Sequence, residues 1–227
     1  MSRSATAHIV NILLLATVVC WTRPAAAQEE GGNRVRIDAD AWADNWFALY
    51  VNGELVVEDS VPYQTERSFN PESFSFEVEL PARVAAIIKD YKENDTGLEY
   101  IGRSRQQMGD GGFSAQFTDA ATGELLAVSD DSWRCIAIHR APLNRGCERS
   151  PEPASACESA IEPVPDHWMS DDFDDSAWPA AIVHSARDVR PHGGYDDVAW
   201  DSSAGLIWTE DLEIDNTILC RFTLAGD

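Results

Sequence analysis

The chain lacks the short motifs that mark common catalytic sites. Its 227 residues contain no Gly-x-Ser-x-Gly elbow, no His-Glu-x-x-His pair and no phosphate-binding glycine loop ahead of a helix. The glycine-rich residues 109–112 are expected to form a hairpin turn instead. Paired carboxylates occur throughout so acidic a chain, so no glycosidase pair stands out. The sequence therefore predicts no catalytic residue.

Basic residues are scarce. Lys and Arg together number 17, against 39 Asp and Glu, which gives a formal net charge of −22. A field of this sign repels phosphate backbones and anionic lipid surfaces, so nucleic acids and membrane surfaces are poor partner candidates. Cations, basic proteins and neutral sugars stay open as partners, and high solubility alone is another reason for such acidity.

A long apolar run is present only near the N-terminus. It extends from Ile9 to Trp21, which is short for a membrane span of roughly 20 residues. Ala25 and Ala27 fit the small-residue rule of signal peptidase. We therefore expect residues 1–27 to be a cleaved signal peptide, with a retained N-terminal anchor as the alternative. The mature chain would be secreted or periplasmic, with no membrane span, and would form a single domain over residues 28–227.

Cysteines are few. Four remain once Cys20 leaves with the signal peptide, and this even number suggests two disulfides in an oxidising compartment, with three possible pairings. Cys147 and Cys157 share a proline-rich stretch, whereas Cys135 and Cys220 lie in strand-like runs. These surroundings favour the pairing Cys147–Cys157 with Cys135–Cys220. The spacing of the four does not suit a zinc site.

Alternation of apolar and polar side chains is abundant. Residues 46–51, 73–80 and 216–224 alternate with the period of two that is typical of half-buried strands, and an Asn-Gly turn follows the first of them at residues 52–53. The proline-rich residues 141–166 break this rhythm and predict a long, disulfide-held loop. No stretch has the pattern of a long amphipathic helix. Many short strands favour an all-β chain folded as an antiparallel β-sandwich.

Two segments resemble parts of a known family. Residues 43–53, Ala-Asp-Asn-Trp-Phe-Ala-Leu-Tyr-Val-Asn-Gly, resemble a strand–turn–strand unit of galactose-binding-like jelly rolls. Residues 168–178, which include Asp-Phe-Asp-Asp-Ser-Ala-Trp, resemble another part of these modules, as do the runs at 206–208 and 219–222 that follow. The usual order of the two parts is reversed here. The resemblance therefore implies a circularly permuted jelly roll.

This resemblance implies a fold more strongly than a function. Galactose-binding-like modules accompany many secreted glycoside hydrolases and sugar esterases, and they often hold a structural Ca²⁺. The leading expectation is thus a secreted, non-catalytic module that binds carbohydrate or a surface partner, with structural calcium. One alternative is a structural or assembly subunit of an extracellular complex, whose acidic face meets a basic protein. The other is a glycan-active hydrolase.

Candidate sugar-binding residues are aromatic, because Trp and Tyr rings offer apolar faces on which sugar rings stack. The candidates are Trp42, Trp46, Tyr50, Tyr195 and Trp200. The alternative for each ring is packing in the core.

Candidate calcium ligands are carboxylates, because Ca²⁺ takes six to eight oxygen ligands. Two acidic clusters supply them, with Asp38, Asp40 and Asp44 in the first and Asp171, Asp172 and Asp174 in the second. The alternative is that these acids cap turns and helix starts.

Overall fold

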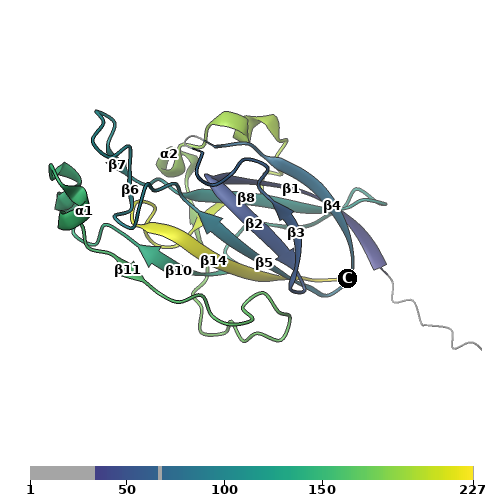
Figure 1. Cartoon of the computed structure of the whole chain (residues 1–227). Helices are drawn as coiled ribbons and strands as arrows, with labels where there is room; N and C mark the ends of the chain where they lie inside the picture. Colours follow the sequence, from purple (N-terminus) through teal and green to yellow (C-terminus); the bar gives the residue numbers. More distant parts are fainter. Residues whose placement is uncertain (1–33, 66–67, 227) are drawn as a thin grey trace, which may run out of the picture. The chain divides into compact units, whose positions relative to one another are not determined.

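The computed structural model describes residues 34–65 and 68–226, and the expected signal peptide lies outside these residues (Figure 1). These described residues belong to one compact unit. Most of the regular secondary structure in the described chain is β-strand, and its helices are only four or five residues long. None of these helices has the length and apolar character needed to cross a membrane.

One six-stranded antiparallel sheet is built around β1 (Arg34–Asp44). On one side β1 pairs with β4 (Glu72–Glu79), and on the other with β8 (Gly112–Asp119). The remaining strands lie beyond β8: β13 (Leu206–Trp208), β12 (Ile182–His184) and β9 (Leu125–Val128). The register places Asp44 opposite Gly112, so the end of β1 meets the start of β8.

The second six-stranded sheet is built around β14 (Asp215–Leu224), which lies between β10 (Arg134–Arg140) and β5 (Ala82–Lys89). Outward from these lie β2 (Trp46–Val51), β3 (Glu54–Glu58) and, at the opposite edge, β11 (Ala160–Ile161). Trp46 is opposite Lys89, so the start of β2 meets the end of β5. A separate ribbon pairs β6 (Leu98–Glu99) with β7 (Gln107–Met108).

A single residue, Asn45, carries the chain from the first sheet to the second. It follows β1 directly and precedes β2, and its backbone N–H donates to the carbonyl of Lys89 at 2.9 Å. The peptide bond between Asp44 and Asn45 is cis. This crossing brings the end of β1 beside the end of β5, although the two strands belong to different sheets.

The main core fills the space between the two sheets with side chains that alternate along each strand. Ala41 and Ala43 from β1 pack in the same buried cluster as Phe47 and Leu49 from β2. The rest of the cluster includes Trp133, Phe117 and Phe222, with the rings of Trp133 and Phe222 stacked at 4.2 Å. Two antiparallel sheets joined by one apolar core confirm the all-β sandwich. The permuted galactose-binding-like topology stays a prediction.

Several local expectations are also confirmed. Asn52 and Gly53 have φ angles of 50° and 85°, the left-handed values that a tight hairpin between β2 and β3 requires. The disulfides are Cys135–Cys220 and Cys147–Cys157, the pairing that the sequence favoured. The second disulfide holds the connection at 141–166, within which the short helices η1 (Arg145–Arg149) and α1 (Pro153–Ala156) lie.

Candidate metal centre

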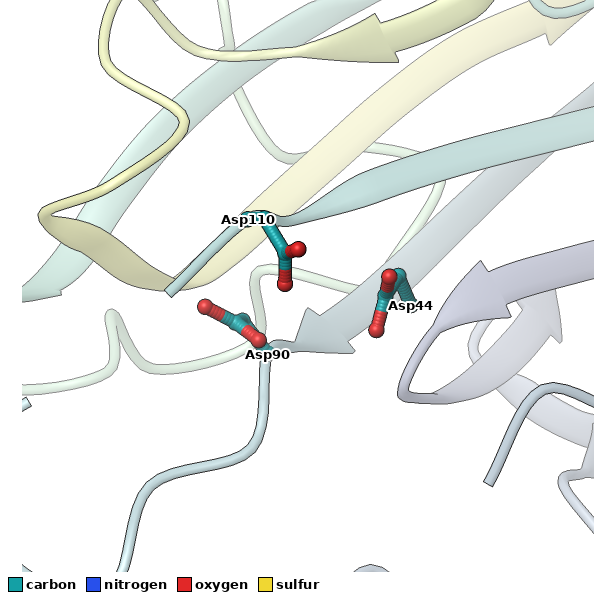
Figure 2. A group of neighbouring side chains, drawn as sticks. All are labelled: Asp44, Asp90 and Asp110. Atoms are coloured by element: carbon teal, nitrogen blue, oxygen red, sulfur yellow. The ribbon is translucent and has the colours of Figure 1, made fainter. Parts of the chain in front are cut away.

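Three aspartates from separate segments meet where the ends of the two sheets come together. Figure 2 shows Asp44, Asp90 and Asp110 around one common space. One carboxylate oxygen from each lies within 4.8 Å of the others. Asp44 is the last residue of β1, Asp90 follows β5, and Asp110 lies two residues before β8. Asp44 is only 1% exposed and Asp90 is fully buried. Acidic side chains are almost never buried to this extent without a compensating partner.

Glycines make this convergence possible. Gly109 lies so close to Asp90 that a Cβ there would be 1.6 Å from Oδ2 of Asp90. A Cβ on Gly111 would be 2.4 Å from the ring of Trp208. The expectation of a hairpin turn at residues 109–112 is therefore wrong: the segment links β7 to β8, but these strands pair with other partners. The glycines are required for close packing.

The buried carboxylates lack hydrogen-bond donors. Oδ2 of Asp44 and both carboxylate oxygens of Asp90 meet no hydrogen-bond partner among the described residues. The neighbouring amide of Asn45 is already engaged, because its Oδ1 accepts from the backbone N–H of Tyr91 at 2.5 Å. Buried carboxylate oxygens without donors are expensive, and each such group in a folded protein calls for an explanation.

A fourth acid, Glu99, adds to the negative charge. It is 4% exposed, and its Oε2 accepts from Nε2 of Gln107 at 2.9 Å. Burial raises the pKa of Asp90 well above its usual range, and the charges of Glu99, Asp44 and Asp110 raise it further. The nearby backbone N–H of Tyr91, which donates to Asn45, opposes this rise only in part. Burial likewise raises the pKa of Asp44, and the charges of Asp110 and Glu99 raise it further. The pKa of Asp110 is also raised by burial, and His192 and Arg190 partly offset this.

The carboxylate centre opens onto a small pocket of about 170 Å³. Asp44, Glu99 and Asp110 line it on the side of the centre. The rest of its lining includes Tyr100, Arg105, Gln107 and His192. Asp90 is not part of the lining, so it closes the centre on the side away from the pocket.

This donor set suits a hard cation. The three converging side chains offer oxygen atoms alone, and Ca²⁺ and Mg²⁺ are the ions that prefer carboxylate oxygens. Zinc sites usually include thiolate or imidazole ligands, and none belongs to this group of three. Ca²⁺ fits better than Mg²⁺, because the three ligands come from separate segments of the chain. Ca²⁺ accepts irregular coordination geometry, whereas Mg²⁺ requires a nearly ideal octahedron. The unpartnered oxygens of Asp90 are the observation that a bound cation would explain.

Only one of the acids proposed from sequence belongs to this centre, namely Asp44. Asp38 is exposed, and Asp40 accepts hydrogen bonds from Ser73 at 2.5 Å and Gln116 at 2.9 Å. No acid of the second cluster belongs to the group of three: Asp171 and Asp172 are exposed, and exposed Asp174 accepts from the backbone N–H of Ser176 at 3.0 Å. Five of the six acids proposed from the sequence therefore lie outside this group of three.

Asp90 and Asp110 were not identified from the sequence. Asp90 ends the apolar run Ala-Ala-Ile-Ile-Lys, and Asp110 is flanked by glycines on both sides. An acid directly after a buried strand and an acid between glycines were the available signals. Neither one indicates by itself that the other lies beside it.

The proposed sugar-binding rings do not share an open face. Trp42 is fully buried and donates its indole N–H to the carbonyl of Phe69 at 3.0 Å, which contradicts its expected exposure. Trp46 is 7% exposed. Tyr195 packs edge-on against Trp42 and stacks on Trp200 at 5.4 Å, and both are partly buried.

Tyr50 belongs to a different group of side chains. It is partly buried and packs against Trp168 on the outer side of the second sheet. Trp42, Tyr195 and Trp200 thus pack together, whereas Trp46 and Tyr50 lie on β2, so the five rings do not form one surface.

Comparisons with protein-family models, with curated proteins and with solved structures found no match for this chain. The carboxylate centre is therefore interpreted from its own geometry.

Proposed function

We propose that the protein is a secreted, non-catalytic binding module that binds one divalent cation, Ca²⁺, through Asp44, Asp90 and Asp110. The observation that carries this proposal is the state of Asp90. Its side chain is fully buried, neither oxygen meets a donor in the described chain, and two further carboxylates face it.

Electrostatics supports a cation at this position. Two unit charges 4.8 Å apart repel by roughly 3 kcal/mol at an effective dielectric constant near 20. Three or four ionised carboxylates would repeat this penalty for every pair. Either protons or a cation must neutralise them. At neutral pH in an extracellular fluid, where calcium is abundant, a cation relieves the repulsion and supplies the missing partners of the buried oxygens.

The position of the centre indicates a structural contribution. Asp44 belongs to the first sheet, Asp90 follows a strand of the second, and Asp110 belongs to the connection into β8. An ion held by all three would join the ends of both sheets. Binding to the native state alone stabilises a protein, by about 2.7 kcal/mol when the ligand is at 100 times its dissociation constant.

The pocket beside the centre favours a second candidate, a glycan-active hydrolase. Asp110 lines the pocket and its pKa is raised by burial, a property that a general acid needs. Cation binding and acid catalysis make opposite demands on this carboxylate, because a cation requires it ionised. Calcium binding at neutral pH would therefore count against the hydrolase.

Calorimetric titration of chelator-treated protein with CaCl₂ and MgCl₂, combined with thermal melting, tests the proposal. We expect one equivalent of Ca²⁺ to bind and to raise the melting temperature, with a weaker effect of Mg²⁺. Asp90→Asn is expected to abolish both effects, whereas the exposed Asp172→Asn keeps them. The proposal fails if millimolar Ca²⁺ gives the wild-type protein neither heat of binding nor a melting shift.

A further inference from the structure

We infer that the cation at this centre is open to the adjoining pocket and captures two neighbouring hydroxyl groups of a single neutral sugar unit. This inference rests on the proposed cation site. It assigns the pocket a ligand, and it gives the ion a part in recognition as well as in stability.

The coordination of the ion is incomplete with protein side chains alone. Three carboxylates supply three to six oxygens, and Ca²⁺ takes six to eight. Oδ1 of Asn45 is occupied by the N–H of Tyr91, and Oε2 of Glu99 accepts from Gln107. Asp90 closes the centre on its deep side, whereas Asp44 and Asp110 line the pocket. The remaining coordination positions therefore face the pocket, where water or a ligand oxygen fills them.

Charge decides which ligand oxygen is favoured. Three ionised carboxylates around one Ca²⁺ leave a local charge of about −1. Arg105 lies on the pocket wall and Arg190 acts on Asp110, but neither is one of the three side chains that converge on the ion position. A carboxylate or phosphate ligand would add further negative charge at the ion. Two hydroxyl groups supply oxygen ligands and add none.

The pocket wall offers donors for the rest of a sugar ring. The guanidinium of Arg105 lies over the ring of Tyr100, 4.3 Å from its centroid, and this contact restrains a long side chain beside the pocket. The side-chain amide of Gln107 lines the same pocket and is held by Glu99. Hydrogen bonds from Arg105 to ligand hydroxyls do not require a charged ligand.

Size restricts the ligand to one ring. The pocket of about 170 Å³ is smaller than the 300–1,000 Å³ that is usual for drug-sized ligands. A wider groove of about 720 Å³ shares Asp110 as part of its lining. A terminal unit of a glycan fits the pocket, and the groove gives the next unit a place to continue.

Calorimetry tests the inference. It measures the binding of methyl glycosides of mannose, galactose and fucose to calcium-loaded and to chelator-treated protein. We expect at least one glycoside to bind the calcium-loaded protein and to lose binding at least tenfold after chelation. Methyl galacturonoside is the anionic comparison and is expected to bind more weakly than methyl galactoside. Arg105→Ala should weaken glycoside binding at least tenfold and leave calcium binding unchanged. Arg34→Ala, an exposed arginine at the far end of β1, is the control and should change neither.

The outcomes separate the two proposals. Calcium binding without binding of any of the three glycosides overturns the inference and leaves the cation site standing. Glycoside binding that survives chelation, or tighter binding of the galacturonoside, also overturns it. A protein that binds no calcium overturns the proposed function, and the inference with it.

Discussion

Nε of Arg221 donates to Oδ2 of Asp175 at 2.9 Å, and this ion pair holds an acidic turn on the outer face of the second sheet. Arg221 is fully buried, and its guanidinium also donates to the carbonyls of Trp168 and Ser170. The turn that the sequence suggested as a calcium site is thus organised by a protein cation.

Asp175→Asn is expected to lower the free energy of unfolding by about 3 kcal/mol, because it leaves the buried Arg221 charge without its partner. Asp174→Asn should leave it nearly unchanged, since Asp174 is exposed and Asn keeps an acceptor for Ser176. Urea unfolding of the two variants measures the difference. Equal effects would mean that Arg221 does not depend on this pair.

Gly109→Ala tests the packing against Asp90. A Cβ at residue 109 would overlap Oδ2 of Asp90, so we expect the variant to lose calcium binding and to melt at a lower temperature. Gly146→Ala is the matched control, because a Cβ there meets nothing within 4 Å and its φ is not positive. Calcium titration of both variants checks this. Unchanged binding in Gly109→Ala would contradict the placement of Asp90.

The cation site predicts a specific dependence on pH. The folded pKa of Asp90 is raised, chiefly by burial, so the protonated native form is favoured. The contribution of protonated Asp90 to stability is complete below the pKa of Asp in the unfolded chain, about 3.9. It is lost as the pH rises through the higher pKa of Asp90 in the folded protein. In a chelator the free energy of unfolding should therefore fall as the pH rises above about 4.

Calcium should reverse this loss, because the ionised carboxylates are the form that binds it. The calcium-induced rise in melting temperature is thus expected to be larger at about pH 8 than at about pH 5. Thermal melting with calcium and with chelator at both pH values measures it. A shift of the same size at both would show that these carboxylates do not take up the ion.

Period-two alternation predicted the strands well, because one face of each strand is buried against the other sheet. The β2–β3 hairpin followed from Asn52 and Gly53, whose left-handed φ angles the turn requires. Alternation does not show what covers the outer face. Trp42 lies on the outer face of β1, yet Val189 and Tyr195 cover it.

The carboxylate centre could not be predicted, because its members are neighbours only through tertiary packing. Asp44 and Asp90 meet because Asn45 passes the chain between two sheets. Asp110 joins them because Gly109 has no side chain to obstruct Asp90. Acids that are close in sequence, such as Asp171 and Asp172, gave a stronger signal and are simply exposed.

The two disulfides should differ in their contribution to stability. Cys135 and Cys220 are separated by 85 residues, and Cys147 and Cys157 by 10. Loop-closure entropy assigns about 4.5 kcal/mol to the first and about 2.7 kcal/mol to the second. Replacing both cysteines of each pair by alanine and measuring urea unfolding tests this order. A larger loss from the 147–157 pair would show that the connection at 141–166 contributes more than its loop length implies.

Asp59 is a second buried acid, separate from the cation site, whose ionisation affects the stability of the protein. Burial raises its pKa to about 6; the N–H of Val61, which donates to Oδ1 at 2.8 Å, opposes this rise, and Glu72 adds to it. Oδ2 has no hydrogen-bond partner in the described chain. Because the folded pKa is raised, Asp59 lowers the stability of the protein as the pH rises through about 6.

Asp59→Asn keeps the acceptor for Val61 and removes the charge. It should raise the free energy of unfolding by about 1 to 3 kcal/mol at about pH 8, since each pKa unit corresponds to about 1.4 kcal/mol. The gain should shrink toward zero at about pH 4, where the native carboxyl is already neutral. Asp131→Asn, at an exposed acid, is the control and should show no such trend. Urea unfolding in a chelator at both pH values measures the effect, and a gain independent of pH would mean that packing of the amide, and not loss of the buried charge, accounts for it.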